Sequence, residues 1–354
     1  MSAQSSDQPF RQSFHIERST PESRIALVLA ILGLIALAVG PWWLDRNGMR
    51  LAGEFFIYLG LATLWNLLAG YAGLVSVGQQ AYVGIGGYAL FYFAISLGVP
   101  PVLTVPLAGI VAAIIAVPVS WLVFRLKGAY FAIGTWVVAE VFLLLASQWS
   151  SMGGGSGTSL PIALIKSIAS SRTMREYVVY YETVGVSIAI IIAVYILLRS
   201  RWGLALQAIR DSEMAAETAG VSVANAKRLL YVVACAGAAM IGALIFMSKL
   251  RISPTAAFSL NDWTAFVIFI TVIGGIGRIE GPVIGTIVFF VLRETLADLG
   301  AWYLIVLGAA AVITMLYAPK GIWGLIADRF GWQLFPVGRR LVLTDTQQKP
   351  PKDP

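Results

Sequence analysis

The stretch GLALQAIRDSEMAAETAG, residues 203–220, is a polar island between hydrophobic segments that itself has the pattern of a helix. Asp211 or Ser212 can cap a helix start, because a short side-chain oxygen satisfies an otherwise unpaired backbone N–H. Glu213 then lies near the positive end of the helix dipole, and Gly220 lies where a left-handed residue ends a helix. The stretch therefore predicts a helix of about two turns. Such a helix between membrane spans suits docking of a soluble partner, and an ordinary loop is the alternative.

The composition around this island is that of a membrane protein. Hydrophobic residues make up 58% and charged residues 12% of the 354 positions, whereas soluble domains carry about 25% charged residues. The apolar residues come in blocks of about 17–25, which is the length of a transmembrane helix. They do not alternate with polar residues as in a transmembrane β-barrel. We therefore expect an all-α polytopic membrane protein, and the composition argues against a soluble enzyme.

The side chains that carry most metal and triad chemistry are scarce. The single cysteine, Cys235, lies in an apolar block, and the single histidine, His15, lies in the polar N-terminal tail. This rules out an intrachain disulfide and a cysteine-based metal site, and we expect neither catalytic residues nor a metal site. The net charge of +7 comes from basic residues dispersed among the loops. This dispersion favours a role in membrane topology over nucleic-acid binding.

About ten transmembrane helices are expected. They cover residues 25–44, 51–69, 80–97, 102–124, 129–147, 184–198, 229–247, 263–276, 282–299 and 302–317. The ninth is short, because Arg293 and Glu294 interrupt its apolar run. The chain thus divides into a polar tail over residues 1–24, without the pattern of a cleaved signal peptide, a membrane domain over 25–318, and a polar tail over 319–354.

The basic residues predict the orientation of the chain. Ten spans place both termini on one side, and that side collects 17 of the 25 Lys and Arg residues, against 7 on the other side, with Arg293 unassigned. Positive charge is retained on the cytoplasmic side. Both termini and residues 203–220 are therefore predicted to be cytoplasmic, and the glycine-rich loop over residues 153–157 is predicted to be outside.

A glycine-rich stretch, NLLAGYAGLVSVGQQAYVGIGG over residues 66–87, contains Ser76, Gln79 and Gln80 and cannot form a smooth apolar helix. Non-helical backbone at membrane depth survives only where protein or a watery cavity satisfies it, and small residues let helices approach closely. The stretch is thus a close helix crossing or a break that lines a pathway, and we favour close packing with pathway lining as an addition.

A second glycine stretch, GGIGRIEGP over residues 274–282, is not a nucleotide loop, because no GK[ST] follows it. Its position roughly mirrors residues 70–78 of the first half, with two glycines three residues apart at the end of an apolar block in both. Internal repeats are common in transporters. The pattern suggests two weakly related halves, with chance similarity as the alternative.

Glu140 is the clearest charge inside an apolar block, and such charges are costly and often functional. It is either a polar contact in a translocation path or the acceptor of a hydrogen bond from a neighbouring span. Thr135 lies five residues earlier, about 140° around a regular helix, so the two need not share a face. Glu54, Arg293 and Glu294 lie nearer the expected membrane interfaces, where snorkelling or pairing is the simpler explanation.

Ten short motifs occur in order along about residues 50–326. They are GYAGLVSVGQQAYVGIGGY from Gly70, YFAIGT from Tyr130 with Glu140, MGGGSG from Met152, AIRDSEMAAETAG from Ala208, KRLLY from Lys227, AGAAMIGAL from Ala236, ISP from Ile252, GGIG from Gly274, GPVIG from Gly281 and PKGIWG ending at Gly324. In this combination they resemble the LivM-type permeases of branched-chain amino-acid ABC importers.

The resemblance implies an importer in the bacterial cytoplasmic (inner) membrane, surrounded by lipid. Its other parts would be a LivH-like sister permease, two ATPase subunits and a periplasmic solute-binding protein. Residues 203–220 would be the cytoplasmic coupling segment that docks into the ATPase, through residues that include Arg210, Asp211, Glu213, Ala215, Ala216 and Gly220. ATP and magnesium would bind to the ATPase subunits, so we expect no cofactor in this chain.

The chain departs from the family pattern at four positions. Met214 stands where the importer signature has a glutamate, and Gln79 stands where many relatives have histidine. Arg278 and Glu280 occupy a turn that is usually less charged. The resemblance therefore indicates the class of transporter better than it indicates the solute or the ion pairs between residues 203–220 and the ATPase.

The leading interpretation is the permease subunit of an ATP-driven importer for branched-chain or related amino acids. The same machine could instead carry urea, short amides or another small organic solute. A stand-alone channel or secondary transporter is a different class, but membrane-embedded acidic residues for ion coupling are scarce. A membrane enzyme is disfavoured, because the spans contain no histidine. The tentative path residues are Ser76, Gln79, Gln80, Thr135 and Glu140.

Overall fold

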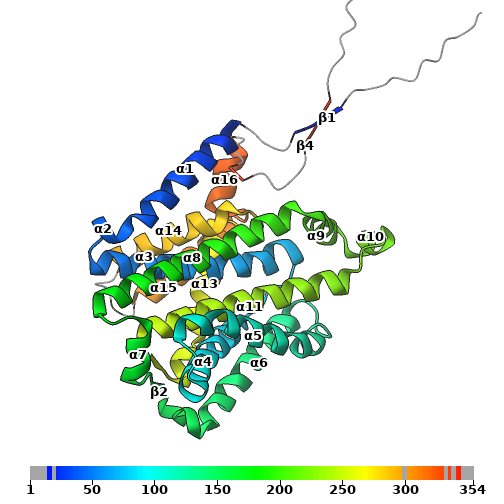
Figure 1. Cartoon of the computed structure of the whole chain (residues 1–354). Coiled ribbons are helices and arrows are strands. Elements are labelled where there is room, and N and C mark those ends of the chain that lie inside the picture. The colour runs from blue at the N-terminus through cyan, green and yellow to red at the C-terminus, as the bar shows by residue number, and fades with distance from the viewer. Residues whose placement is uncertain are drawn as a thin grey trace, which may run out of the picture.

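The computed structural model describes residues 14–17, 21–296, 300, 302–330, 334–335 and 340–343. Within these residues, eight helical segments are long and apolar enough to cross a membrane. This confirms the all-α polytopic membrane fold expected from the sequence (Figure 1). The principal helices are α3 (Arg46–Asn66), α4 (Gln79–Leu97), α5 (Pro101–Val123), α6 (Ala129–Gln148), α8 (Arg172–Arg199), α11 (Val223–Lys249), α13 (Phe266–Gly274), α15 (Trp302–Tyr317) and α16 (Gly321–Phe330).

Two of the ten expected spans are shorter than a typical transmembrane helix of about 20 residues. The first divides into α1 (Pro21–Ala38) and α2 (Gly40–Trp43), because Pro41 has no N–H with which to continue the hydrogen bonding of α1. The ninth is α14 (Glu280–Thr295), and its expected end at residues 297–299 lies outside the described residues. The remaining expected spans correspond to the eight long segments.

The helices form a bundle in which α3, α4 and α11 are central. About 72% of the apolar window of α3, 67% of that of α4 and 72% of that of α11 are buried, but only 22% of that of α6. Helix α11 packs along α4 and α5, α3 packs along α8, and α13 packs along α14. Helix α6 therefore lies at the edge of the bundle.

Short elements gather at the two ends of the bundle (Figure 1). Helices α9 (Arg201–Asp211) and α10 (Glu213–Thr218) lie at one end, and α7 (Ile162–Ile168) lies at the other. Strand β2 (Thr158–Ser159) pairs antiparallel with β3 (Arg251–Ile252), and β1 (Phe14–Glu17) pairs antiparallel with β4 (Arg340–Leu343). The remaining short helices are η2 (Ser150–Met152), η3 (Gly154–Ser156), α12 (Pro254–Ala257) and the π-helix η4 (Asn261–Ala265).

Candidate solute path and coupling segment

The first glycine stretch combines a helix break with close packing. Helix α3 ends in a π-helix, η1 (Leu67–Tyr71), and the backbone leaves the helical conformation before α4 begins at Gln79. Gly73 lies in this break with φ of +68°. Farther along, a Cβ atom on Gly86 would collide with the backbone of Ala239 on α11. Both roles expected for the stretch are therefore present, at different residues.

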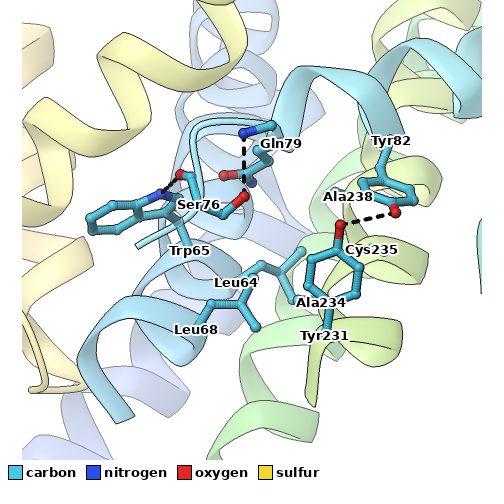
Figure 2. Close-up of a pocket in the computed structure, with 11 residues that line it drawn as sticks. Leu64, Trp65, Leu68, Ser76, Gln79, Tyr82, Tyr231, Ala234, Cys235 and Ala238 are labelled. Atoms are coloured by element: carbon cyan, nitrogen blue, oxygen red, sulfur yellow. Dashed lines mark hydrogen bonds between the residues drawn. The ribbon is translucent and has the colours of Figure 1, made fainter. Parts of the chain in front are cut away.

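A small cavity lies between this break and α11 (Figure 2). Its wall combines polar residues of the break, α4 and α11 with apolar residues of α3, η1 and α11. The lining residues are Leu64, Trp65, Leu68, Ser76, Gly78, Gln79, Tyr82, Tyr231, Ala234, Cys235 and Ala238. The cavity has a volume of about 20 Å³, which is room for about one water molecule. The cavity is therefore closed to an amino acid in this conformation.

Ser76 and Gln79 both line the cavity. Trp65 Nε1 donates a hydrogen bond of 2.8 Å to Ser76 O, and the Ser76 hydroxyl accepts one of 3.2 Å from the backbone N–H of Gly78. Gln79 Nε2 donates to Leu61 O at 3.0 Å. Gln79 Oε1 is buried without a hydrogen-bond partner among the described residues, which is costly unless a water or another donor reaches it. The two side chains predicted at this break are thus brought together.

The opposite wall of the cavity carries two tyrosines. The hydroxyl groups of Tyr82 on α4 and Tyr231 on α11 lie 3.1 Å apart, and the rings meet edge to face. Cys235 lies one turn after Tyr231 and is buried. Neither tyrosine is predicted from the sequence, because each follows an apolar helical pattern that gives no sign of a polar cavity.

Gln80 and Thr135 tie segments together next to this cavity. The backbone N–H of Gln80 donates to Thr264 Oγ1 at 3.2 Å, and the Thr264 hydroxyl donates to Gln80 Oε1. Thr135 Oγ1 on α6 accepts a bond of 3.0 Å from the backbone N–H of Val77. Gln80 and Thr135 are both buried, and neither lines the cavity. They fix the position of the break between η4 and α6.

Glu140 does not join this group. It lies on the exposed side of α6, whereas Thr135 is buried on the inner side. Its carboxylate accepts a hydrogen bond of 3.0 Å from Trp136 Nε1 on the same helix. The partner is thus on its own helix, one turn earlier, and not on a neighbouring span. Glu140 is therefore separated from Ser76 and Gln79 by the thickness of α6.

The polar stretch over residues 203–220 forms two helices where the sequence predicted one. Ser212, with extended backbone between α9 and α10, caps α10 by accepting a bond of 3.2 Å from Ala215 N. At the other end, Gly220 has φ of +84°. Its N–H bonds to Glu217 O, and the Val221 N–H bonds to Ala216 O, which is the Schellman arrangement. Of the two predicted caps, Ser212 is the one used by α10, and Gly220 ends that helix as predicted.

The side chains of this segment differ in whether they face their own chain or point outward. Ala216 is only 1% exposed and packs against Ile209, Val223 and Ala226 of its own chain. Asp211, Glu213, Ala215 and Gly220 are exposed, and Glu213 forms an ion pair of 2.5 Å with Lys227. Met214 is 78% exposed. An apolar residue within a polar helix is unusual, and this marks Met214 in the sequence. Only the structure shows that the Met214 side chain points outward.

Arg210 connects this segment to the second glycine stretch. A Cβ atom on Gly277 would lie 2.6 Å from Arg210 Nη1, and a Cβ atom on Gly70 would lie 2.5 Å from Gly277 N. The two glycine stretches therefore meet, and the end of α9 rests on their meeting point. Asn66 secures the contact, because its side chain accepts from Gly277 N at 2.7 Å and donates to Arg278 O at 2.8 Å.

The charged residues that set this chain apart are also in contacts. Arg278 pairs with Asp328 on α16 at 2.9 Å, and Glu280 is buried and accepts a bond of 2.8 Å from the backbone N–H of Phe335. Glu54 and Arg293, which were predicted to be paired or snorkelling, form an ion pair of 2.8 Å with each other.

Comparison with known proteins places these features in a family. Residues 49–315, about three quarters of the chain, match the family described as "Branched-chain amino acid transport system / permease component". This chain belongs to that family. It is a multi-pass membrane permease, and a permease component is one part of a transport system. The family resemblance expected from the ordered motifs is confirmed.

Individual relatives of this permease share about a quarter of its residues. It is 28% identical over 330 residues to the "High-affinity branched-chain amino acid transport system permease protein LivM" of Escherichia coli strain K12, covering 87% of this chain and 76% of the relative. It is 26% identical over 329 residues to the "Fructose import permease protein FrcC" of Rhizobium meliloti, covering 85% and 86%. The comparison with solved structures finds no match.

Proposed function

We propose that this chain is the permease subunit of an ATP-driven importer for branched-chain amino acids in the inner membrane. A sister permease, two ATPase subunits and a periplasmic binding protein complete the machine, and ATP with magnesium binds to the ATPases. Both termini and helices α9 and α10 lie in the cytoplasm. The contact of Arg210 with Gly277 carries the proposal, because it joins an exposed, doubly capped segment to the meeting point of the two glycine stretches.

The coupling part of the proposal follows from this geometry. A short helix fixed by Ser212 at its start and by a left-handed glycine at its end moves as a rigid body. Helix α9 ends at Arg210 and Asp211, so a displacement of the segment reaches Gly277 and Gly70 through the Arg210 guanidinium. Gly70 belongs to η1, and the break and its cavity follow directly after η1.

The solute part of the proposal rests on the cavity and on the relatives. Apolar walls from Leu64, Leu68 and Ala238 face polar atoms of Gln79 and Tyr231, a mixture that suits a solute with an apolar side chain and a polar end. The LivM relatives are named for branched-chain amino acids, and the fructose permease shows that similar sequences serve a sugar. Fructose is therefore the second solute to test.

Reconstitution tests the proposal directly. The chain is co-expressed with the sister permease and the ATPases of its transport system, and the complex is placed in liposomes with the binding protein. Leucine uptake that requires ATP is expected, together with no ATP hydrolysis by the purified chain alone, since it has no phosphate loop. ATP-driven fructose uptake in place of leucine uptake would change the solute. Uptake by the chain alone under an ion gradient would replace the importer with a secondary transporter.

A further inference from the structure

The outward face of α6 differs from the outward faces of α5 and α8. Its exposed residues recur every three or four positions and form one stripe along the helix, made of residues 129, 130, 133, 136, 137, 140, 141, 144, 145 and 148. Glu140 is at the centre of this stripe, twelfth of the 20 residues of α6. The flanking members, which include Ile133, Val137, Val141 and Leu144, are apolar and more than two fifths exposed.

The corresponding stripes on α5 and α8 have the composition of lipid-facing surfaces. The exposed residues of α5 are Leu103, Pro106, Ile110, Ile114, Val117, Pro118, Trp121 and Leu122. In the second half of α8, the exposed residues include Ala189, Ile192 and Ile196. The hydrocarbon of a bilayer offers no hydrogen-bond donor, and intramembrane carboxylates therefore face protein or water. Helix α6 is exposed in this chain, but its midpoint does not suit contact with lipid.

The stripe also does not suit a purely aqueous path. A carboxylate has about four acceptor sites, and in the described part of the chain Trp136 supplies one donor. The residues above and below Glu140 on the stripe are large and apolar, so water along the stripe would leave them hydrated. A protein surface satisfies both needs, because it buries the apolar residues and offers a donor to the carboxylate.

We infer that the α6 stripe is the surface on which the sister permease packs, with a hydrogen-bond donor of that subunit opposite Glu140. The inference rests on the proposed function, in which the sister permease is the other subunit that spans the membrane. The ATPases and the binding protein lie outside the bilayer and cannot reach the middle of α6. The complementary surface is thus a helix face that is apolar except for one donor, such as an arginine, lysine, asparagine or tryptophan side chain, at the depth of Glu140.

Photo-cross-linking in the assembled transporter tests the surface. A benzophenone amino acid replaces Val137 or Val141 on α6, and matched controls carry it at Ile114 on α5 and Ile192 on α8, which are also exposed and apolar. Irradiation is expected to join the α6 variants, but not the controls, to a tagged sister permease. Equal products from all four positions, no product from α6, or a product between two copies of this chain would each overturn the inference.

Substitution of Glu140 separates the interface from lipid and from the path. Glu140→Leu leaves the donor of the sister permease unpaired, so its recovery with the tagged chain falls at least about tenfold, while Glu140→Gln and the control Val141→Leu retain it. Full recovery with Glu140→Leu would overturn the inference, whether uptake is kept, as on a lipid face, or lost, as in an aqueous path. Leucine uptake by the wild-type complex is measured in parallel. A cross-link from α6 without ATP-driven uptake would refute the proposed function and leave the interface standing.

Discussion

The side-chain amide of Asn66 holds the backbone of Gly277, which lies 211 residues away in the sequence. Asn66 Oδ1 accepts a bond of 2.7 Å from Gly277 N, and Asn66 Nδ2 donates one of 2.8 Å to Arg278 O. One side chain thus satisfies a donor and an acceptor of a turn that the helices leave unpaired. It closes the contact between the first and second glycine stretches, on which Arg210 of the coupling segment rests.

Asn66→Ala removes both bonds and leaves two part-buried backbone groups unpaired. We expect a loss of about 1–3 kcal/mol in the free energy of unfolding, because an unsatisfied buried polar group costs that amount. Thermal unfolding in detergent measures the loss. Asn225→Ala is the control, since Asn225 is exposed and its contact with Arg228 is long, at 3.4 Å. An equal, small effect of both substitutions would contradict the role given to Asn66.

Gly70→Ala places a methyl group where the Gly277 backbone lies, 2.5 Å from its nitrogen. Overpacking of this kind lowers the free energy of unfolding by about 1–3 kcal/mol, because the two glycine stretches must move apart to make room for the methyl group. Gly53→Ala on α3 meets no atom within 4 Å and is expected to be neutral or stabilising, because alanine favours helix over glycine. Melting temperatures of the two variants check this difference, and similar values would show that the stretches do not need their close contact.

Met214→Lys tests the outward surface of α10. The side chain is 78% exposed, so we expect the free energy of unfolding of the isolated chain to change by less than about 0.5 kcal/mol. The assembled complex should lose ATPase subunits during purification, because a positive charge replaces an apolar side chain at the dock. Met174→Lys, on an exposed methionine near the start of α8, the end of that helix away from α9, should retain them. Ala216→Asp should fail differently, because a charge buried against Ile209 and Val223 of the same chain disrupts α10 itself. Normal ATPase retention by Met214→Lys would place the dock elsewhere.

Gly220→Val tests the end of α10. Gly220 has φ of +84°, and a β-branched residue opposes that left-handed backbone by about 1–2 kcal/mol. We expect slower ATP-driven uptake at normal amounts of protein in the membrane, since the segment loses its fixed end. Gly220→Asn should be milder, because asparagine tolerates this conformation. Uptake and expression are measured for both, and equal uptake by Val and wild type would show that the stop is dispensable.

The predicted orientation is tested by labelling with a thiol reagent that does not cross the membrane. Ser156→Cys should react in intact spheroplasts, and Met214→Cys should react only after the membrane is opened. Both side chains are exposed, and the native Cys235 is buried, so background labelling is low. Met214 is preferred to Ser212, whose hydroxyl caps α10. The reverse labelling pattern would place α9 and α10 outside and exclude a contact with ATPases.

The sequence by itself determined the class of fold and the position of most helices. Apolar runs of spanning length have one stable solution in a bilayer, because a helix satisfies its own backbone. Local chemistry also determined the ends of α10, since Ser212 and Gly220 act on backbone groups within a few residues. The first span is short because Pro41 interrupts its helix. The ninth span is short because the charged Arg293 interrupts its apolar run.

Only the tertiary structure decided which side each polar residue faces. Thr135 and Glu140 occupy the same apolar segment, but packing of α6 on α4 turns the first inward and leaves the second exposed. Ala216 was expected to take part in coupling to the ATPase, but it is buried against its own chain, whereas Met214 and the other residues of this helix are exposed. Asn66 and Gly277 meet because α3 and α13 pack side by side. Contacts between residues so far apart depend on the packing of whole helices, which no local pattern specifies.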